Sequence, residues 1–419
     1  MPRLWAGVDA GKGHHHCVVI DENGHRLYSE RVPNSEDELL ELISTVTELA
    51  GGDALVWATD LNRGGAALLL GLLTAHHQNV IYIPGYAVHH ASKAYRGDGK
   101  SDAKDAAIIA DQARIRRDLQ IREPDDETSI ELRVLTTHRR DLVRDRTRAL
   151  NRIRSHLLEY FPALERSFDF SASRASLVLL TGYATPEKLR KMGQTRLTKW
   201  LLARGSRTAA ATAQTAIEAA KSQHSVLPGQ SIGAQLAGQL AQDVITLETR
   251  IADLDKLIEK RLEDTRQAQL LTSMPGFGSL LAAEFLASTG TDLTTFDTVD
   301  RLAGVAGLAP ASKDSGRISG NHHRPRRYDR RLLRACYLAA MISVRHDTDS
   351  RTFYDRKRRE GKSHIQAVLA LARRRLNVIW AMFRDDQTYT PPTTSETNSG
   401  KPATPAFPPN TLPAAALAA

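Results

Sequence analysis

The sequence predicts an α/β domain followed by a mainly α-helical remainder. Short apolar runs bounded by turn residues alternate with helical patterns in the first part of the chain. From about Glu127 onward the pattern is almost entirely helical, and from about Thr388 the chain is rich in Pro, Thr and Ala, which predicts a disordered tail. A chain of 419 residues is long enough for two or three domains. We expect an α/β domain at residues 1–125 and a helical linker at 126–268. A helical C-terminal domain at 269–387 and a tail at 388–419 are expected to follow.

The first elements are three strands in succession. Leu4 to Val8 and Cys17 to Ile20 are apolar runs, and the turn residues Gly11 and Gly13 lie between them. The stretch ENGH at 22–25 contains Asn-Gly, a hairpin turn signal, and RLYSERV after it has strand character. A third strand is therefore expected to follow by a hairpin.

A helix is expected next, because Ser35 stands as an N-cap and Glu38 three residues later completes a capping box. Two more apolar strands are expected at residues 54–60 and 79–85, with an apolar helix between them at 64–75. A final helix begins near Ser101. The order is three strands, helix, strand, helix, strand, helix. This is the succession of the ribonuclease-H-like α/β fold, in which the first and fourth strands lie side by side.

Four aspartates are expected to converge in this fold. Asp9 ends the first strand and Asp60 ends the fourth. Asp102 and Asp105 in KSDAKDAAII lie on one face of a helix, with β-carbons roughly 5–6 Å apart. Taken alone, such a pair has an alternative explanation, because aspartates near a helix N-terminus complement the positive end of the helix dipole. Four carboxylates at one place repel strongly without a cation, and hard divalent ions such as Mg²⁺ take carboxylate oxygens, so we expect all four to bind metal.

The helical remainder contains a heptad pattern and a tight turn. Apolar residues step alternately by four and three at Leu240, Val244, Leu247, Ile251, Leu254 and Ile258. This spacing predicts a coiled coil, and a long helix packed in its own domain is the alternative. Further on, Pro275, Gly276 and Gly278 form a turn that opens a helix, as in the phosphate-approaching turn of helix-hairpin-helix modules.

The charge of the chain indicates a polyanionic partner. Lys and Arg total 57 against 48 acidic residues, a formal net charge of +9. Arg-rich, helix-compatible runs lie at 139–154, 324–334, 356–362 and 372–376. They are typical of a phosphate-binding surface, and solvated helix faces are the alternative.

Several classes of protein are disfavoured. Two cysteines, Cys17 and Cys336, are too few for a disulfide framework or a cysteine-based zinc site. The adjacent histidines at 14–16 and 322–323 lack cysteine partners, so zinc is not expected. The apolar segment at 64–75 is shorter than the roughly 20 residues that span a bilayer, and the N-terminus shows no signal-peptide pattern. We expect a cytoplasmic, nucleoid-associated protein without a membrane partner.

Five features together resemble one family. They are VDAGK, the acid that ends the strand at 60, KSDAKDA, the MPGFG turn, and GLAPASKDSG followed by an Arg-rich helix. They are similar to the insertion-sequence transposases with a four-acid RuvC-like domain, the insertion sequence one-ten family. That family is related to Piv-type DNA invertases and is also called the bridge-RNA-guided recombinases. The resemblance spans roughly residues 4–385. The family's acids are usually Asp, Glu, Asp and Asp, so Asp60 is one methylene shorter than the usual second acid.

The resemblance implies a DNA recombinase with a serine nucleophile. The family's serine motif maps onto Ser315, and Ser312 and Ser319 are close enough to be alternatives. It also implies Mg²⁺ at the acids, a phosphoserine intermediate, donor and target DNA, and an element-encoded bridge RNA. Homodimers that pair into tetramers are implied as well, and the heptad helix offers one way to join chains. Two rival functions stay open: a Mg²⁺-dependent junction resolvase or nuclease that uses water, and an inactive nucleic-acid-binding scaffold.

Arginines in the linker and in the C-terminal domain are expected to bind nucleic-acid phosphates. One group lies in the first Arg-rich run and the other follows the serine motif: Arg139, Arg140, Arg144 and Arg148, then Arg317, Arg324, Arg326 and Arg327. The sequence does not separate arginines that face RNA from those that face DNA.

Overall fold

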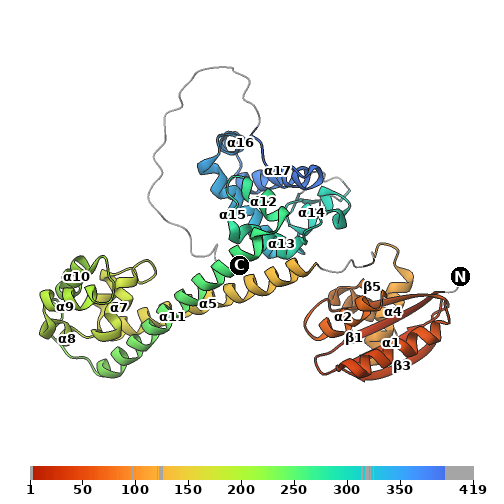
Figure 1. Ribbon diagram of the computed structural model, residues 1–419, viewed down its shortest axis with the longest axis horizontal. Coiled ribbons are helices and arrows are strands. Elements are labelled where there is room, and N and C mark those ends of the chain that lie inside the picture. The colour runs from red at the N-terminus through yellow and green to blue at the C-terminus, as the bar shows by residue number, and fades with distance from the viewer. Residues whose placement is uncertain are drawn as a thin grey trace, which may run out of the picture. The chain divides into compact units, whose positions relative to one another are not determined.

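The computed structural model describes residues 3–95, 99, 101–119, 121, 126–312, 315–316, 320, 322–323 and 325–391. The chain divides into two compact units, of which the first ends at Pro124 and the second begins at Asp125 (Figure 1). Of the predicted tail, residues 392–419 lie outside the described residues.

The first unit is built on a five-stranded mixed sheet. Its strands are β1 (Arg3–Ala10), β2 (His14–Ile20), β3 (Arg26–Pro33), β4 (Ala54–Thr59) and β5 (Asn79–Tyr82). Their order is β3-β2-β1-β4-β5, with antiparallel pairing from β3 to β1 and parallel pairing from β1 to β5. The predicted ribonuclease-H-like succession of strands is therefore present, and β1 lies directly beside β4.

Helices cover both faces of this sheet (Figure 1). They are α1 (Glu36–Ala50), the short η1 (Gly64–Ala66), α2 (Ala67–Ala75), α3 (Gly85–Ser92) and α4 (Asp102–Ile115). Alternate residues of β1, including Leu4 and Val8, join the core formed with α1 and α2. The opposite face packs against α4, where Ile108 and Ile109 are buried. Parallel strands covered on both faces need nearly continuous apolar runs, which the sequence supplies.

Two predictions about local structure in this unit need correction. Ser35 is the N-cap of α1, but its side chain accepts no capping hydrogen bond, so the predicted capping box is wrong. Three acidic residues in the first turn instead complement the positive end of the helix dipole. Helix α3 was not expected, because Gly85 directly after a strand reads as a loop residue.

A long antiparallel helical hairpin runs through the second unit. Helices α5 (Glu127–Tyr160) and α11 (Gln230–Glu263) form it (Figure 1). Three ion pairs cross from α5 to α11 in antiparallel register, namely Glu131 to Arg261, Arg139 to Asp255 and Arg146 to Glu248. In the predicted heptad, Val244 and Ile258 are buried and the other four residues are half-buried. The partner of the heptad helix in this structure is thus α5 of the same chain.

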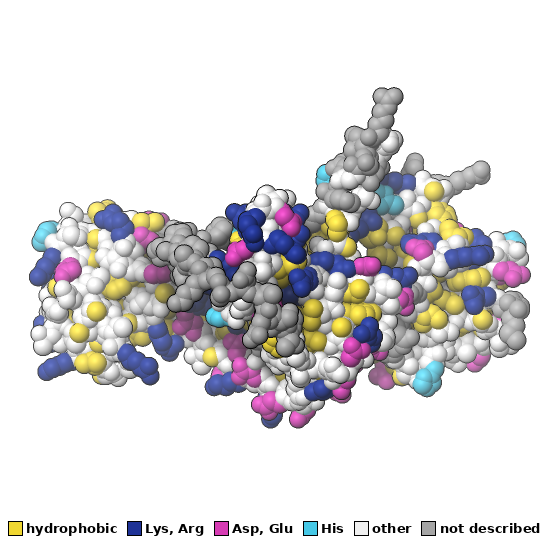
Figure 2. Space-filling view, turned by 90° about the horizontal axis from the view of Figure 1, so that it is seen from above, with side chains coloured by type: hydrophobic (Ala, Val, Ile, Leu, Met, Phe, Trp, Pro, Cys, Tyr) yellow, Lys and Arg dark blue, Asp and Glu magenta, His cyan; other side chains and the backbone are white. Residues whose placement is uncertain are grey.

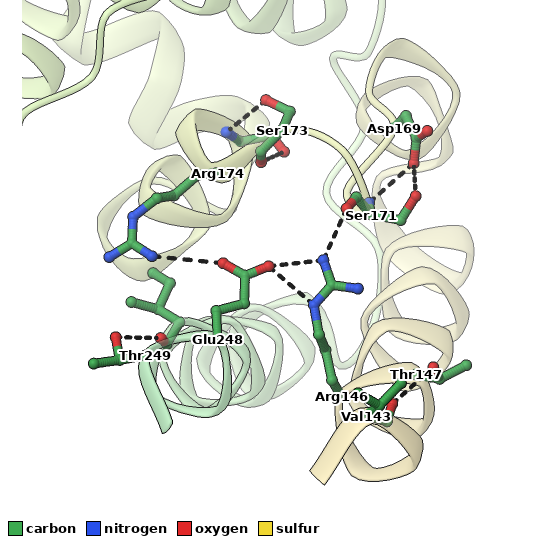
Figure 3. A network of polar contacts seen from close by, with 11 residues as sticks. Val143, Arg146, Thr147, Asp169, Ser171, Ser173, Arg174, Glu248 and Thr249 are labelled. Carbon is green, nitrogen blue, oxygen red and sulfur yellow. Dashed lines mark hydrogen bonds and ion pairs between the residues drawn. The ribbon is translucent and has the colours of Figure 1, made fainter. Parts of the chain in front are cut away.

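Each end of the hairpin carries a helical body with its own core. One body contains α6 (Pro162–Ser167), α7 (Arg174–Gly182), α8 (Pro186–Met192), α9 (Gln194–Leu202) and α10 (Ala209–Lys221). We call it the tip body. The Glu248 carboxylate of α11 lies between Arg146 of α5 and Arg174 of α7, which ties the tip body to the hairpin (Figure 3).

The C-terminal body lies at the other end of the hairpin. It contains α12 (Arg266–Ser273), α13 (Ser279–Thr289), η2 (Thr294–Phe296), α14 (Val299–Val305), β6 (Ala311–Ser312), β7 (His322–His323), α15 (Arg330–His346), α16 (Thr348–Arg359) and α17 (His364–Asp385). The β6–β7 pair was not predicted from the sequence. Within the Arg-rich run at 324–334, α15 begins at Arg330, where the Asp329 side chain caps it.

The turn between α12 and α13 forms where the sequence predicted it. A β-carbon on Gly276, which has φ +90°, would lie 2.2 Å from the carbonyl oxygen of Ala339 in α15. This glycine therefore serves close packing of the turn on α15 and is not open to a phosphate. No helix in the described part of the chain is both long and apolar enough to cross a bilayer.

Candidate active site

Asp9 and Asp60 lie together at one edge of the sheet. Val8 of β1 pairs with Thr59 of β4 in parallel register, so the residue after each stands at the same level. The backbone N–H of Ala10 donates to Oδ1 of Asp60 at 3.5 Å. The two acids come from segments far apart in the sequence, and the parallel pairing of the two strands brings them to one place.

Helix α4 reaches the same edge because Gly7 lets it approach β1. A β-carbon on Gly7 would lie 2.3 Å from both the carbonyl oxygen of Ala106 and the backbone nitrogen of Ala110. The Ser101 side chain accepts a hydrogen bond from the N–H of Lys104 at 3.2 Å, which starts the helix at Asp102. Both acids of KSDAKDA are thereby fixed in the first turn, facing the end of β1.

All four predicted acids line one cleft of about 590 Å³. Asp102 is exposed, and the other three are half-buried. The cleft is also lined by Gly85, Val88, His89, Ser92, Lys93, Tyr95, Gly99 and Lys104. Helix α3, which the sequence did not predict, thus contributes a wall, and two lysines lie on the lining beside the acids.

The electrostatics of the cleft disfavour an isolated negative charge. Burial raises the pKa of Asp60, the charge of Asp105 raises it further, and the Ala10 N–H acts in the opposite sense. The pKa of Tyr82 is also raised, first by burial and then by Asp60. A bound cation would change this balance in favour of the ionised carboxylates.

The donor chemistry of the cleft fits a hard divalent cation, for which carboxylate oxygens are the preferred ligands. Within the described ranges, however, no three His, Cys, Asp or Glu side chains stand close enough to enclose a metal ion. The carboxylates share a cleft but do not form a closed ligand set, so side-chain rotation would have to bring their oxygens together.

Ser315 lies in the second unit, on the loop between β6 and β7. The two strands pair Ala311 with His323 and Ser312 with His322. Ser315 is exposed, as is Ser312, while Ser319 lies outside the described residues. The serine and the acids therefore come from separate units of the chain.

The predicted phosphate-binding arginines differ in their surroundings. Arg139 is held by Asp255 across the hairpin, at 3.1 Å between Nη2 and Oδ2. Arg144 and Arg148 are exposed and pair with Asp141 and Asp145 on their own helix. Arg326 and Arg327 are exposed, and Arg317 and Arg324 lie outside the described residues. On the face shown in Figure 2, Lys and Arg side chains are interspersed with Asp and Glu.

Arg140 stands out from this group. It is half-buried, and its Nε has no hydrogen-bond partner in the part of the chain that the structure describes. Burial lowers the pKa of Arg140, and the charges of Arg331 and Arg144 lower it further. Arg331 of α15 donates to Oγ1 of Thr137 at 2.8 Å, which holds it beside α5. The sequence prediction missed Arg331, because an Arg-rich run does not reveal which arginine faces another helix.

Two family models match the chain. One, named for the DEDD transposases of IS110 and described as a transposase, matches residues 6–162. The other describes the IS116/IS110/IS902 transposase family and matches residues 268–355. A DEDD domain indicates a ribonuclease-H-like fold and a divalent metal ion. The ribonuclease-H-like fold agrees with the observed sheet, and a divalent metal ion agrees with the acidic cleft.

Relatives align along nearly the whole chain. The Insertion element IS900 uncharacterized 42 kDa protein of Mycobacterium paratuberculosis is 58% identical, over 94% of this chain and 98% of its own length. The Insertion element IS116 uncharacterized 44.8 kDa protein of Streptomyces clavuligerus is 47% identical, over 93% and 96%. A more distant match, 28% identical over 32% of this chain and 42% of its own length, is the Pilin gene-inverting protein of Moraxella bovis. The chain therefore belongs to the IS116/IS110/IS902 family of transposases.

Proposed function

We propose that this transposase cleaves and rejoins DNA through a covalent phosphoserine intermediate. The observation that carries the proposal is the convergence of Asp9, Asp60, Asp102 and Asp105 on one cleft. Such a cleft suits a phosphodiester reaction, because both the attacking and the leaving oxygen carry negative charge as the reaction proceeds.

The four aspartates would hold Mg²⁺, which when bound would polarise the scissile phosphate and lower the pKa of the serine hydroxyl. Lys93 and Lys104 line the same cleft and would neutralise charge on the flanking phosphates. The backbone N–H of Ala10 would keep Asp60 oriented through the hydrogen bond already present.

Ser315 would supply the nucleophile. Its Oγ would bond to phosphorus while the bond from phosphorus to the 3′ oxygen breaks, and the serine proton would end on the leaving 3′ oxygen. The phosphodiester is exchanged and not hydrolysed, so a second DNA end can reverse the step without ATP. The exposed position of Ser315 between two short strands supports this role, because the hydroxyl must reach an acidic cleft that belongs to another unit.

We also propose that an element-encoded bridge RNA pairs with donor and target DNA, and that the active form is a homodimer or a tetramer. Arg140 and Arg331 would contact a nucleic-acid backbone, because their charges act on each other and Nε of Arg140 has no hydrogen-bond partner among the described residues. Site-specific recombination by RNA-free protein would contradict the guided part of this proposal.

The test uses a suicide DNA substrate that traps the covalent intermediate. Ser315→Ala should form no protein–DNA adduct, because the attacking oxygen is gone. Ser312→Ala is the matched control: it removes an exposed hydroxyl from the same hairpin and should leave adduct formation intact. An adduct formed by Ser315→Ala at the wild-type level would refute the assignment.

A nuclease or junction resolvase that uses water is the second candidate. It is favoured by one observation: all four acids lie within the first unit, without any contribution from Ser315. It predicts nicked DNA that carries no protein, in wild type and Ser315→Ala alike. An inactive scaffold, suggested by Asp60 in place of Glu, predicts nucleic-acid binding without any strand cleavage.

A further inference from the structure

The tip body lies almost wholly outside the two family matches, which cover residues 6–162 and 268–355. It is nevertheless a folded element of the chain. Phe161, Phe170 and Leu197 are fully buried in its core, and Arg174 of α7 ties it to the hairpin by pairing with Glu248 of α11 (Figure 3). The mechanism proposed above gives this body no task.

The tip body contains a strongly basic segment that lies outside the four Arg-rich runs found in the sequence. Residues 186–207, PEKLRKMGQTRLTKWLLARGSR, hold seven Lys and Arg against one acidic residue, Glu187. This leaves a net charge of +6 in 22 residues, out of +9 for the whole chain. A solvated helix face usually mixes both signs of charge, and this segment does not.

The basic side chains of α8 and α9 point away from the core. Leu197 and Leu201 of α9 are fully buried and Trp200 packs against the same core, while the basic residues Arg196 and Lys199 are exposed. Six basic side chains of the segment are exposed, and we call them the basic face: Lys188, Lys191, Arg196, Lys199, Arg204 and Arg207. The seventh, Arg190, is half-buried and donates to the carbonyl oxygens of Ala220 and Gln223, which makes it structural.

Internal contacts order part of the basic face without neutralising it. Nε of Arg196 donates to the carbonyl oxygen of Met192 at 2.8 Å, which holds α9 against the end of α8. The Arg204 guanidinium lies 3.9 Å above the Trp200 ring. Lys191 pairs with Glu187 at 2.7 Å. Lys188 donates its backbone N–H to Oγ1 of Thr185. Among the described residues, the side chains of Lys188, Lys199 and Arg207 make no hydrogen bond or ion pair, so these three cations are available.

We propose that the basic face binds the phosphate backbone of nucleic acid. The proposal rests on the function proposed above in one respect, namely that the partner of this protein is nucleic acid. A membrane surface fits less well, because the apolar residues of α9 face the core, apart from the exposed Leu202, and leave no apolar stripe to enter a bilayer. Arg204 covers the Trp200 ring, so the contact would be to phosphates and independent of base sequence.

The position of the tip body at one end of the hairpin would lengthen the nucleic-acid binding site. Helices α5 and α11 have 34 residues each, so the hairpin is about 50 Å long from end to end. Nucleic acid bound at both ends of the hairpin would be held at points separated by roughly 15 base pairs of a duplex. The tip body would thus extend the footprint well beyond the catalytic residues.

The test is fluorescence anisotropy with full-length protein in EDTA, on a labelled duplex DNA and an RNA hairpin of the same length. Lys188→Glu/Lys199→Glu/Arg207→Glu should weaken binding to at least one probe about tenfold or more. It should also lower the slope of log K against log salt by about 2 to 3, close to one unit for each phosphate that the variant no longer neutralises. Lys188→Gln/Lys199→Gln/Arg207→Gln should give a smaller loss in the same direction.

The matched control is Arg250→Glu/Lys256→Glu/Lys260→Glu, three exposed cations of α11 with the same change in net charge. It should retain most of the affinity and the salt slope. Equal losses in the control, or unchanged binding to both probes in the tip variants, would each overturn the proposal. Because the assay contains no divalent metal and needs no cleavage, it stands apart from the tests of Ser315.

Discussion

At the scale of single residues, Asp60 carries the clearest conflict between stability and activity. Burial raises its pKa above the ordinary value, which means that the folded state favours the protonated form. The stability contributed by this group is full below pH 3.8 and is lost as the pH rises through the raised pKa. An ionised Asp60 at neutral pH therefore costs stability, as functional carboxylates often do.

We predict that Asp60→Asn stabilises the metal-free protein at pH 7 and abolishes DNA cleavage. The gain should be about 1 kcal/mol or less, because the site is only partly buried, and it should vanish near pH 4. Urea denaturation in EDTA at the two pH values measures it. Asp102→Asn, at an exposed position, should lose cleavage without a comparable gain. A destabilised Asp60→Asn at pH 7 would contradict this account.

His15 predicts a second pH effect. It is 1% exposed and neither ring nitrogen has a hydrogen-bond partner within the described residues. Burial lowers its pKa, Asn34 acts in the opposite sense and His14 lowers it again. The stability that depends on neutral His15 is full above pH 6.5 and is lost as the pH falls through the lowered pKa.

His15→Gln should therefore lose less stability than wild type between pH 7 and pH 5, as measured by urea denaturation at each pH. The exposed His76→Gln is the control and should follow the wild-type slope. An unchanged slope for His15→Gln would show that the buried imidazole does not set the acid sensitivity of this sheet.

At the scale of elements, the contact of α4 with β1 positions the acidic cleft. Gly7→Ala would place a β-carbon 2.3 Å from two backbone atoms of α4 and force the helix away from the strand. We predict a loss of about 1–3 kcal/mol in stability, typical of overpacking, together with a large loss of cleavage. Gly13→Ala is the control, because a β-carbon there meets nothing within 4 Å. Equal stabilities for the two variants would show that this close approach does not matter.

The ion pair that joins α5 to α11 beside the tip body predicts a measurable coupling. Arg146 donates to Oε1 of Glu248 from Nε at 3.0 Å and from Nη2 at 2.7 Å, and both side chains are 24% exposed (Figure 3). A double-mutant cycle of Arg146→Ala and Glu248→Ala should give a coupling energy of about 1–3 kcal/mol. The same cycle on the exposed Arg144 and Asp141 should give about 0.5 kcal/mol or less. Similar values for the two pairs would contradict the difference in burial.

The elements that the sequence predicted well are those with a local cause. Apolar runs and Gly-rich turns located all five strands of the first sheet, and the strand order then placed Asp9 beside Asp60. Non-local features escaped prediction. The heptad helix has α5 as its partner, and Arg139 belongs to that packing through Asp255, because a periodic pattern does not identify what lies opposite. Helix α3 and the β6–β7 pair are too short to leave a periodic signal.

At the scale of the whole molecule, the chain divides its proposed chemistry between two units. The acids belong to the first unit and Ser315 to the second. A site divided in this way is complete only when the two units, or two chains, are brought together. Nucleic acid that binds both would then act as the assembly signal, which would prevent cleavage by free protein.

The most direct test of this divided centre is to map the covalent adduct by mass spectrometry. Wild-type protein is incubated with suicide DNA substrate, RNA and Mg²⁺, then digested with protease and nuclease. The account predicts one nucleotide-bearing peptide, modified at Ser315, that is absent in EDTA and absent in Asp105→Asn. An adduct on another residue, or cleaved DNA with no adduct at all, would contradict it.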